Sequence, residues 1–171
     1  MNSTIFHNAV RLIALVLLQG LLLRRIAMEW PYFHIVLYPL AIMLLPLRMP
    51  NTLVITLGFA CGLLVDIFYQ TPGLHASAGT WTAFVRAFVL RYLEPRGAGY
   101  NVNYSPTAWR MGLGWFLRYA AILMWLHLFF LFSVEAFTFV FIGEILLKTT
   151  LSFTLSMLFV FIYTVVFNPI E

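Results

Sequence analysis

The sequence predicts an all-α integral membrane protein, and three observations support this fold class. Of its 171 residues, 63% are hydrophobic and only 9% are charged, whereas a soluble domain carries about 25% charged residues. The mean hydropathy is +0.94. The apolar residues form long continuous blocks, unlike the short alternating strands of a transmembrane β-barrel. Lipid must therefore be part of the solvent, because a soluble fold could not bury this much apolar surface.

The length and the apolar blocks predict about six transmembrane helices in one bundle, with residues 1–171 forming a single membrane domain. A spanning helix needs roughly 20 residues. The expected spans are 6–23, 35–47, 52–69, 80–93, 109–132 and 145–167. The second is short for a full crossing, and Pro39 and Pro46 are expected to kink or end it. A re-entrant segment is the alternative for this stretch.

The basic residues predict the orientation of the bundle. The formal net charge of +4 comes from arginines scattered at helix ends, which suits membrane topology rather than nucleic-acid binding. With six spans the termini share a side, and the basic residues on that side are Arg11, Arg48, Arg91, Arg96 and Arg110. The other side carries Arg24, Arg25 and Lys148. Because short cytoplasmic loops are enriched in Lys and Arg, both termini are predicted to be cytoplasmic.

Asp66, the one aspartate in the chain, lies in the apolar run GFACGLLVD. Gly58, Gly62 and Asp66 are spaced by four residues and therefore lie on one helix face. The small-xxx-small pair GFACG lets another helix approach closely, so this face is expected to point into protein. A carboxylate in lipid costs about 2.5–3.5 kcal/mol on insertion scales. We therefore predict an intramembrane ion pair between Asp66 and Arg86.

Other roles for Asp66 remain open at this point. It could hold helices together without a cation, contact a partner protein, or carry an ion or catalyse a reaction. Its only candidate acid–base partner is His127, otherwise expected to be a hydrogen-bonded interior histidine. Arg11, Arg86 and Arg118 could line an anion cavity, although snorkelling to the interface or pairing with glutamates is the favoured interpretation.

Other chemistry finds little support in the sequence. There is no GxSxG nucleophile elbow and no P-loop. The four histidines lack metal-ligand spacing such as HExxH, so neither a metal nor another cofactor is expected. The single cysteine, Cys61, excludes an internal disulfide. The sequence therefore predicts a protein that is not an enzyme.

The stretch GFACGLLVDIFYQTPGLHA resembles the rod-shape-determining protein MreD family. The motif residues are Gly62, Leu63, Leu64 and Asp66, followed by Gly73 and the small residues Ala76 and Ala78, and the earlier YPLAIMLLPLRMP is similar to the family's second span. The resemblance implies a fold like that of substrate-binding subunits of energy-coupling-factor vitamin transporters. It also implies a non-enzymatic inner-membrane component of the cell-elongation (rod) complex, which helps control lateral peptidoglycan synthesis and cell shape.

The same resemblance implies an MreC-like protein as a binding partner, with MreB filaments, RodA and a class B penicillin-binding protein as direct or indirect partners. The expected partner or helix-packing interface is Gly58, Gly62, Asp66, Gly73 and His75. The alternative is a vitamin-type transporter subunit, with Trp81, Phe84, Phe88 and Trp125 lining an outer pocket. Against it, Ala14 is followed four residues later by Leu18, so the Ala-xxx-Ala docking signal of such subunits is missing.

Overall fold

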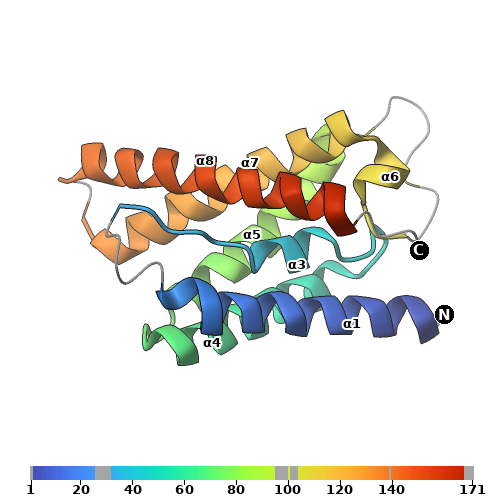
Figure 1. The fold of residues 1–171 in the computed structure, drawn as a ribbon, viewed down its shortest axis with the longest axis horizontal. Coiled ribbons are helices and arrows are strands. Elements are labelled where there is room, and N and C mark those ends of the chain that lie inside the picture. Colours follow the sequence, from blue (N-terminus) through green and yellow to red (C-terminus); the bar gives the residue numbers. More distant parts are fainter. Residues whose placement is uncertain (1, 26–31, 95–99, 101–103, 139, 168–171) are drawn as a thin grey trace.

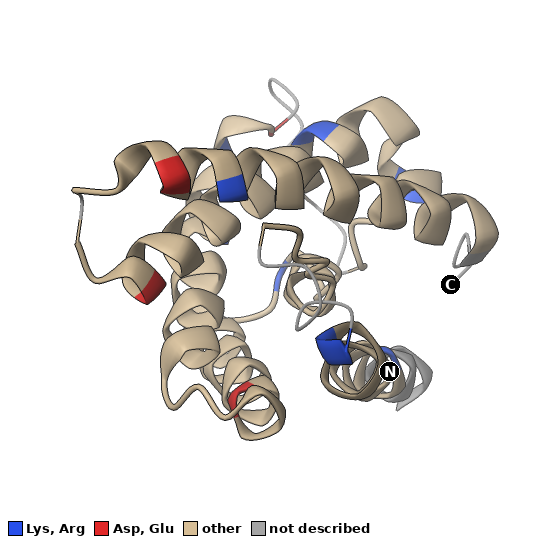
Figure 2. Ribbon diagram, turned by 60° about the vertical axis from the view of Figure 1, so that its left-hand side comes forward, with Lys and Arg blue, Asp and Glu red and all other residues tan. Residues whose placement is uncertain are grey.

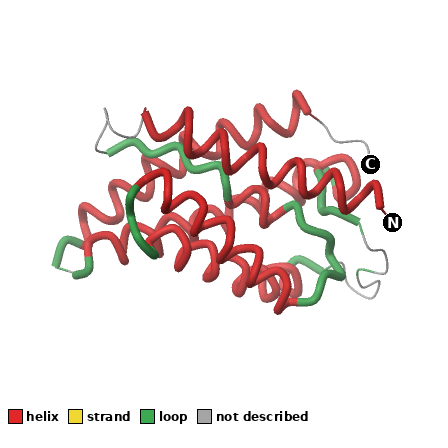
Figure 3. The backbone as a smooth tube through the Cα atoms, turned by 90° about the horizontal axis from the view of Figure 1, so that it is seen from below, coloured by secondary structure: helices red, strands yellow, loops and turns green. Residues whose placement is uncertain are grey.

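The computed structural model describes residues 2–25, 32–94, 100, 104–138 and 140–167, and in these ranges the chain is helix and loop without a strand (Figure 3). The first helix, α1 (Asn2–Leu17), continues into the π-helical η1 (Leu18–Leu23). The helices that follow are α3 (Pro39–Met43), α4 (Asn51–Tyr69), α5 (Leu74–Tyr92), α6 (Ala108–Met111), α7 (Leu113–Ala136) and α8 (Ile142–Phe167).

The long helices run lengthwise through the molecule; α1, α4 and α7 run in one direction and α5 and α8 run back in the other (Figure 1). α1 begins and α8 ends at one end, where α6 also lies (Figure 1). We call this end of the molecule the termini end. We call the opposite end, where residues 70–73 join α4 to α5, the hairpin end. At the termini end Leu47 N–H donates to the Tyr104 carbonyl, and Tyr100 Oη donates to the Leu90 carbonyl. Burial, followed by the nearby Glu94 charge, raises the pKa of Tyr100 to about 12.

Three helices are long and apolar enough to cross a membrane, namely α4, α7 and Ile142–Val166 of α8, and Asn8–Leu23 is a shorter apolar helix. Charged residues are sparse along the described ribbon (Figure 2). Large apolar side chains are exposed on several helices, among them Leu22, Ile67 and Val166 at 62%, 67% and 66%. These features agree with a helical membrane protein, but the described helices do not by themselves give six spans.

The expected second span is not a continuous helix. Residues 33–37 are extended, and only Pro39–Met43 forms α3 (Figure 3). Pro39 occupies the start of α3, where the missing N–H costs nothing. The helix ends within a few residues because Pro46 cannot continue it. The two prolines therefore leave room for a single short helix, and hydropathy alone could not distinguish a buried extended segment from a helical one.

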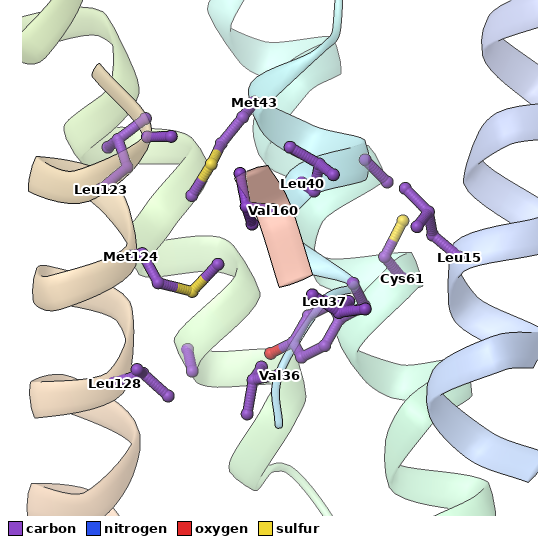
Figure 4. Close-up of a cluster of buried hydrophobic side chains, with 14 of the residues drawn as sticks. Leu15, Val36, Leu37, Leu40, Met43, Cys61, Leu123, Met124, Leu128 and Val160 are labelled. Carbon is purple, nitrogen blue, oxygen red and sulfur yellow. The ribbon is translucent and has the colours of Figure 1, made fainter. Parts of the chain in front are cut away.

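The core is built around this broken segment. All residues from Ile35 to Leu45 are buried, and Tyr38, Leu40, Ile42 and Met43 are fully inaccessible. Figure 4 shows Val36, Leu37, Leu40 and Met43 between α7 on one side and α1 and α4 on the other; the flanking residues labelled there are Leu123, Met124, Leu128, Leu15 and Cys61. The long helices thus surround a central segment that is mostly not helical.

α4 and α5 pack together through glycines. A Cβ on Gly58 would lie 2.7 Å from the Gly79 carbonyl oxygen, and one on Gly62 would lie 2.6 Å from the Ala76 Cα. Both distances are shorter than real Cβ contacts, so only glycine permits this approach of two backbones. The face that carries Gly58 and Gly62 is therefore covered by α5 and is not open to another protein.

Candidate functional site

Asp66 lies in the last turn of α4 and holds the beginning of α5. Its carboxylate accepts backbone hydrogen bonds from His75 at 2.8 Å, Ala76 at 2.9 Å and Gly73 at 3.1 Å. Thr71 Oγ1 donates to the same carboxylate at 2.9 Å, and His75 Nδ1 lies 3.1 Å from it. Asp66 is only 4% exposed. Four donors and the His75 ring nitrogen thus surround the two carboxylate oxygens, which offsets the loss of hydration.

The local sequence explains this geometry. Gln70 and Gly73 adopt left-handed backbone conformations, with φ of 58° and 88°, and the chain reverses between them. Gly73 provides the second of these at little cost, because it has no Cβ. The first backbone N–H groups of a helix have no intrahelical partners, and a negative charge there is favourable. Asp66 therefore caps α5 across the turn, and α5 begins at Leu74 rather than at residue 80 as expected.

His75 links this cap to the central segment. Its carbonyl accepts a hydrogen bond from Tyr38 Oη at 3.1 Å, and its ring packs against the rings of Tyr69 and Tyr38. Its Nδ1 also lies 3.1 Å from Thr71 Oγ1. The imidazole is thus enclosed by α4, the turn and the central segment, and it is 5% exposed.

The expected ion pair between Asp66 and Arg86 is wrong. Arg86 lies eleven residues after His75 on α5, about 16 Å further along the helix axis. Its guanidinium instead donates to the Leu45 carbonyl, to the Pro46 carbonyl at 3.3 Å and, through Nε, to Tyr119 Oη at 3.0 Å. Tyr119 Oη in turn donates to the Met43 carbonyl at 3.0 Å. Arg86 and Tyr119 thus satisfy the carbonyls left free where α3 ends.

Arg86→Met is expected to lower the free energy of unfolding by about 2–4 kcal/mol, because it leaves buried carbonyls without donors. Arg91→Met is the matched control, since Arg91 lies on the same helix but is exposed, and should change stability by less than about 0.5 kcal/mol. Denaturant titration of the detergent-solubilised variants measures both. Equal effects of the two substitutions would show that the carbonyl contacts contribute nothing to stability.

The extended segment is held by side chains that the sequence analysis did not single out. Gln19 of η1 donates through Nε2 to the Ile35 carbonyl at 3.0 Å and accepts from Leu37 N–H at 2.7 Å. Ser152 and Ser156 of α8 accept from the backbone N–H groups of His34 and Val36 at 3.0 and 2.9 Å. Buried backbone groups outside regular structure need such partners. The only signal in the sequence was the presence of polar residues inside apolar runs.

His127 and Arg118 occupy different environments. His127 is fully buried; its Nδ1 lies 2.7 Å from Thr82 Oγ1, and its Nε2 has no hydrogen-bond partner among the described residues. The Tyr38 ring packs against the rings of both His127 and His75, with centroids 5.1 and 5.9 Å apart, and no hydrogen bond joins His127 to Asp66. Arg118 is exposed on α7 and donates to the Gly114 carbonyl.

Most of the site residues expected from the sequence hold helices of the protein together rather than face its surface. Of the expected interface residues, Gly58, Gly62, Asp66 and His75 are buried at the α4–α5 contact, and only Gly73 is exposed. Across the part of the chain that is described, no three His, Cys, Asp or Glu residues are grouped to hold a metal ion. Arg96, counted above for topology, lies outside the described residues.

Comparison with protein-family models, curated proteins and solved structures gave no match to this chain.

Proposed function

We propose that the protein is an MreD-like, non-enzymatic component of the bacterial rod complex in the inner membrane. In this role it binds an MreC-like protein and helps control lateral peptidoglycan synthesis and cell shape. The observation that supports the proposal most is that the residues of the MreD-like motif together form the α4–α5 hairpin. Gly62 permits the close approach of α5, Asp66 caps α5, and Gly73 makes the turn between them.

The hydrogen bonds of the buried charged groups are those expected of a scaffold protein. The Asp66 carboxylate and the Arg86 guanidinium both hold backbone segments in place, so their charges maintain shape. Exposed apolar helix surfaces, such as those carrying Ile67 and Val166, would leave the membrane-embedded faces available to other membrane proteins. In this proposal the protein acts through those faces and the exposed hairpin turn rather than through the buried Gly58–Gly62 face.

We further propose that the chain crosses the bilayer six times, with the segment around α3 as a broken second crossing. α1 begins and α8 ends at the same end of the molecule (Figure 1), as an even number of crossings requires. Arg48 and Arg110 also lie at this end, in and beside the termini-end loops. By the positive-inside rule the termini end is cytoplasmic.

Single-cysteine labelling is expected to report this orientation. Cys61 is 1% exposed and, replaced by alanine, leaves a cysteine-free chain. Phe137→Cys, at the hairpin end where the side chain is 93% exposed, should react with a membrane-impermeant maleimide in spheroplasts. Trp109→Cys, at the termini end and 59% exposed, should react only after the membrane is opened. The reverse pattern would contradict the orientation, and labelling of both in spheroplasts would contradict an ordered crossing.

The functional proposal is tested by depleting the protein in its native bacterium and by purifying the tagged protein from native membranes. We expect depleted cells to lose their elongated shape. We also expect an MreC-like protein and cell-wall synthases to copurify. Unchanged shape, together with copurifying ATPase subunits and a small-molecule ligand, would contradict the proposal and support the transporter alternative.

A further inference from the structure

An apolar groove runs between α7 and α8 on the surface of the bundle. Its volume is about 700 Å³, and its walls include Leu117 and Ala121 of α7 and Leu155, Leu158 and Phe161 of α8. Among the described residues, Arg118 is the one charged residue that lines it. Thr154 also lines the groove, but its hydroxyl donates to the Thr150 carbonyl. A single arginine beside a largely apolar groove would suit an amphiphile that carries a negative charge.

The position of Arg118 fixes which end of the groove is charged. Arg118 is the sixth residue of α7, so it lies about 7 Å from the termini end of that helix. Its Nε donates to the Gly114 carbonyl at 3.1 Å, so the guanidinium extends back toward the helix start. This is the direction in which an arginine snorkels to reach lipid headgroups.

The length of the groove matches one leaflet. Its α8 wall extends from Leu151 to Phe161, which are ten residues apart and therefore about 15 Å apart along the helix. The hydrocarbon core of a bilayer is about 30 Å thick, so the groove is as long as the acyl region of one leaflet. Because α7 and α8 are antiparallel (Figure 1), Phe161 lies near the end of the groove that carries Arg118.

Arg118 has no carboxylate partner within the described parts of the chain, whereas Lys148 at the other end of the bundle pairs with Glu135 at 4.0 Å. We propose that this groove binds one anionic phospholipid of the cytoplasmic leaflet, with an acyl chain between α7 and α8 and the headgroup phosphate on Arg118. The cytoplasmic leaflet is the one rich in anionic lipids. This inference depends on the membrane crossing proposed above and not on a role in the rod complex.

Native mass spectrometry of the intact protein in detergent, titrated with phosphatidylglycerol or with phosphatidylcholine of the same acyl chains, tests the proposal. We expect one phosphatidylglycerol to bind more tightly than phosphatidylcholine. Arg118→Ala and Arg118→Gln should each weaken phosphatidylglycerol binding about fivefold, from about 1 kcal/mol per basic residue near the surface. Ala121→Trp, which fills the groove, should weaken binding of both lipids.

Arg91→Ala is the matched control. Arg91 is an exposed arginine at the termini end of α5, beside a smaller recess of about 170 Å³, and its loss should leave lipid binding unchanged. Gel filtration of each variant shows whether it is folded, and two neutral replacements of Arg118 guard against the failure of one. Equal affinity for the two lipids, or an equal loss in Arg91→Ala, would overturn the proposal. So would a protein dimer that excludes lipid and is lost in Ala121→Trp, because the groove would then join two copies.

Discussion

Gly62→Ala is expected to lower the free energy of unfolding by about 3 kcal/mol or more, the upper part of the range for overpacked sites. The added methyl would overlap the backbone carbonyl of His75 and approach the Ala76 Cα to 2.6 Å. A flexible side chain could move aside, but these are backbone atoms of α5. To remove the overlap, α5 would have to move away from α4. This movement would also pull the backbone N–H groups of Gly73, His75 and Ala76 away from the Asp66 carboxylate.

Gly143→Ala provides the control for this substitution. Gly143 lies in the first turn of α8, and a Cβ there would meet nothing within 4 Å. Alanine has the higher helix propensity, so this variant should be neutral or slightly more stable. Denaturant titration in detergent micelles compares the two variants. If Gly62→Ala were as stable as Gly143→Ala, the close approach of α4 and α5 would not be the reason for the glycine.

Asp66→Asn is expected to cost about 2–4 kcal/mol, because an amide has one acceptor oxygen where the carboxylate has two. Thr71, His75 N–H and the His75 ring share Oδ1, whereas Gly73 N–H and Ala76 N–H share Oδ2. Whichever way the amide is oriented, its NH₂ group faces at least one backbone N–H, which can only donate. The substitution also removes the negative charge at the start of α5, which a helix N-terminus favours.

Thr71→Val is the matched control for the cap, because it removes one of the donors and leaves the carboxylate. Its cost should stay below about 1.5 kcal/mol, the usual net value of a single hydrogen bond. Unfolding free energies and the helical signal of the folded state measure both variants. An Asp66→Asn protein within about 0.5 kcal/mol of the parent would contradict a cap made by the carboxylate.

The parts of the fold that depend on composition could be predicted from the sequence. Apolar content and continuous blocks gave the helical membrane class, and α4, α7 and α8 cover three of the expected spans. The spacing of Gly58, Gly62 and Asp66 correctly placed this face against protein rather than lipid, because a period of four residues is a property of the helix itself. These features depend on residues close together in the chain.

The features that the sequence analysis missed depend on distant contacts. Residues 33–37 are extended because Gln19, Ser152 and Ser156 supply hydrogen bonds from helices far away in the chain. The early start of α5 depends on Asp66, eight residues before Leu74. Arg86 was assigned to Asp66 because it was the nearest in sequence of the candidate basic residues at suitable depth, although an arginine can equally satisfy carbonyls at a helix end. Charge pairing by sequence distance therefore gave the wrong partner.

The central claim is that Asp66 and Arg86 support two separate backbone features, the α4–α5 turn and the end of α3. A double-mutant cycle of Asp66→Asn and Arg86→Met, measured as unfolding free energies in detergent micelles, tests it most directly. The two sites share no partner and are separated by about three turns of α5, so the costs should add to within about 0.5 kcal/mol. A coupling energy above about 1 kcal/mol would contradict this assignment and restore the ion pair.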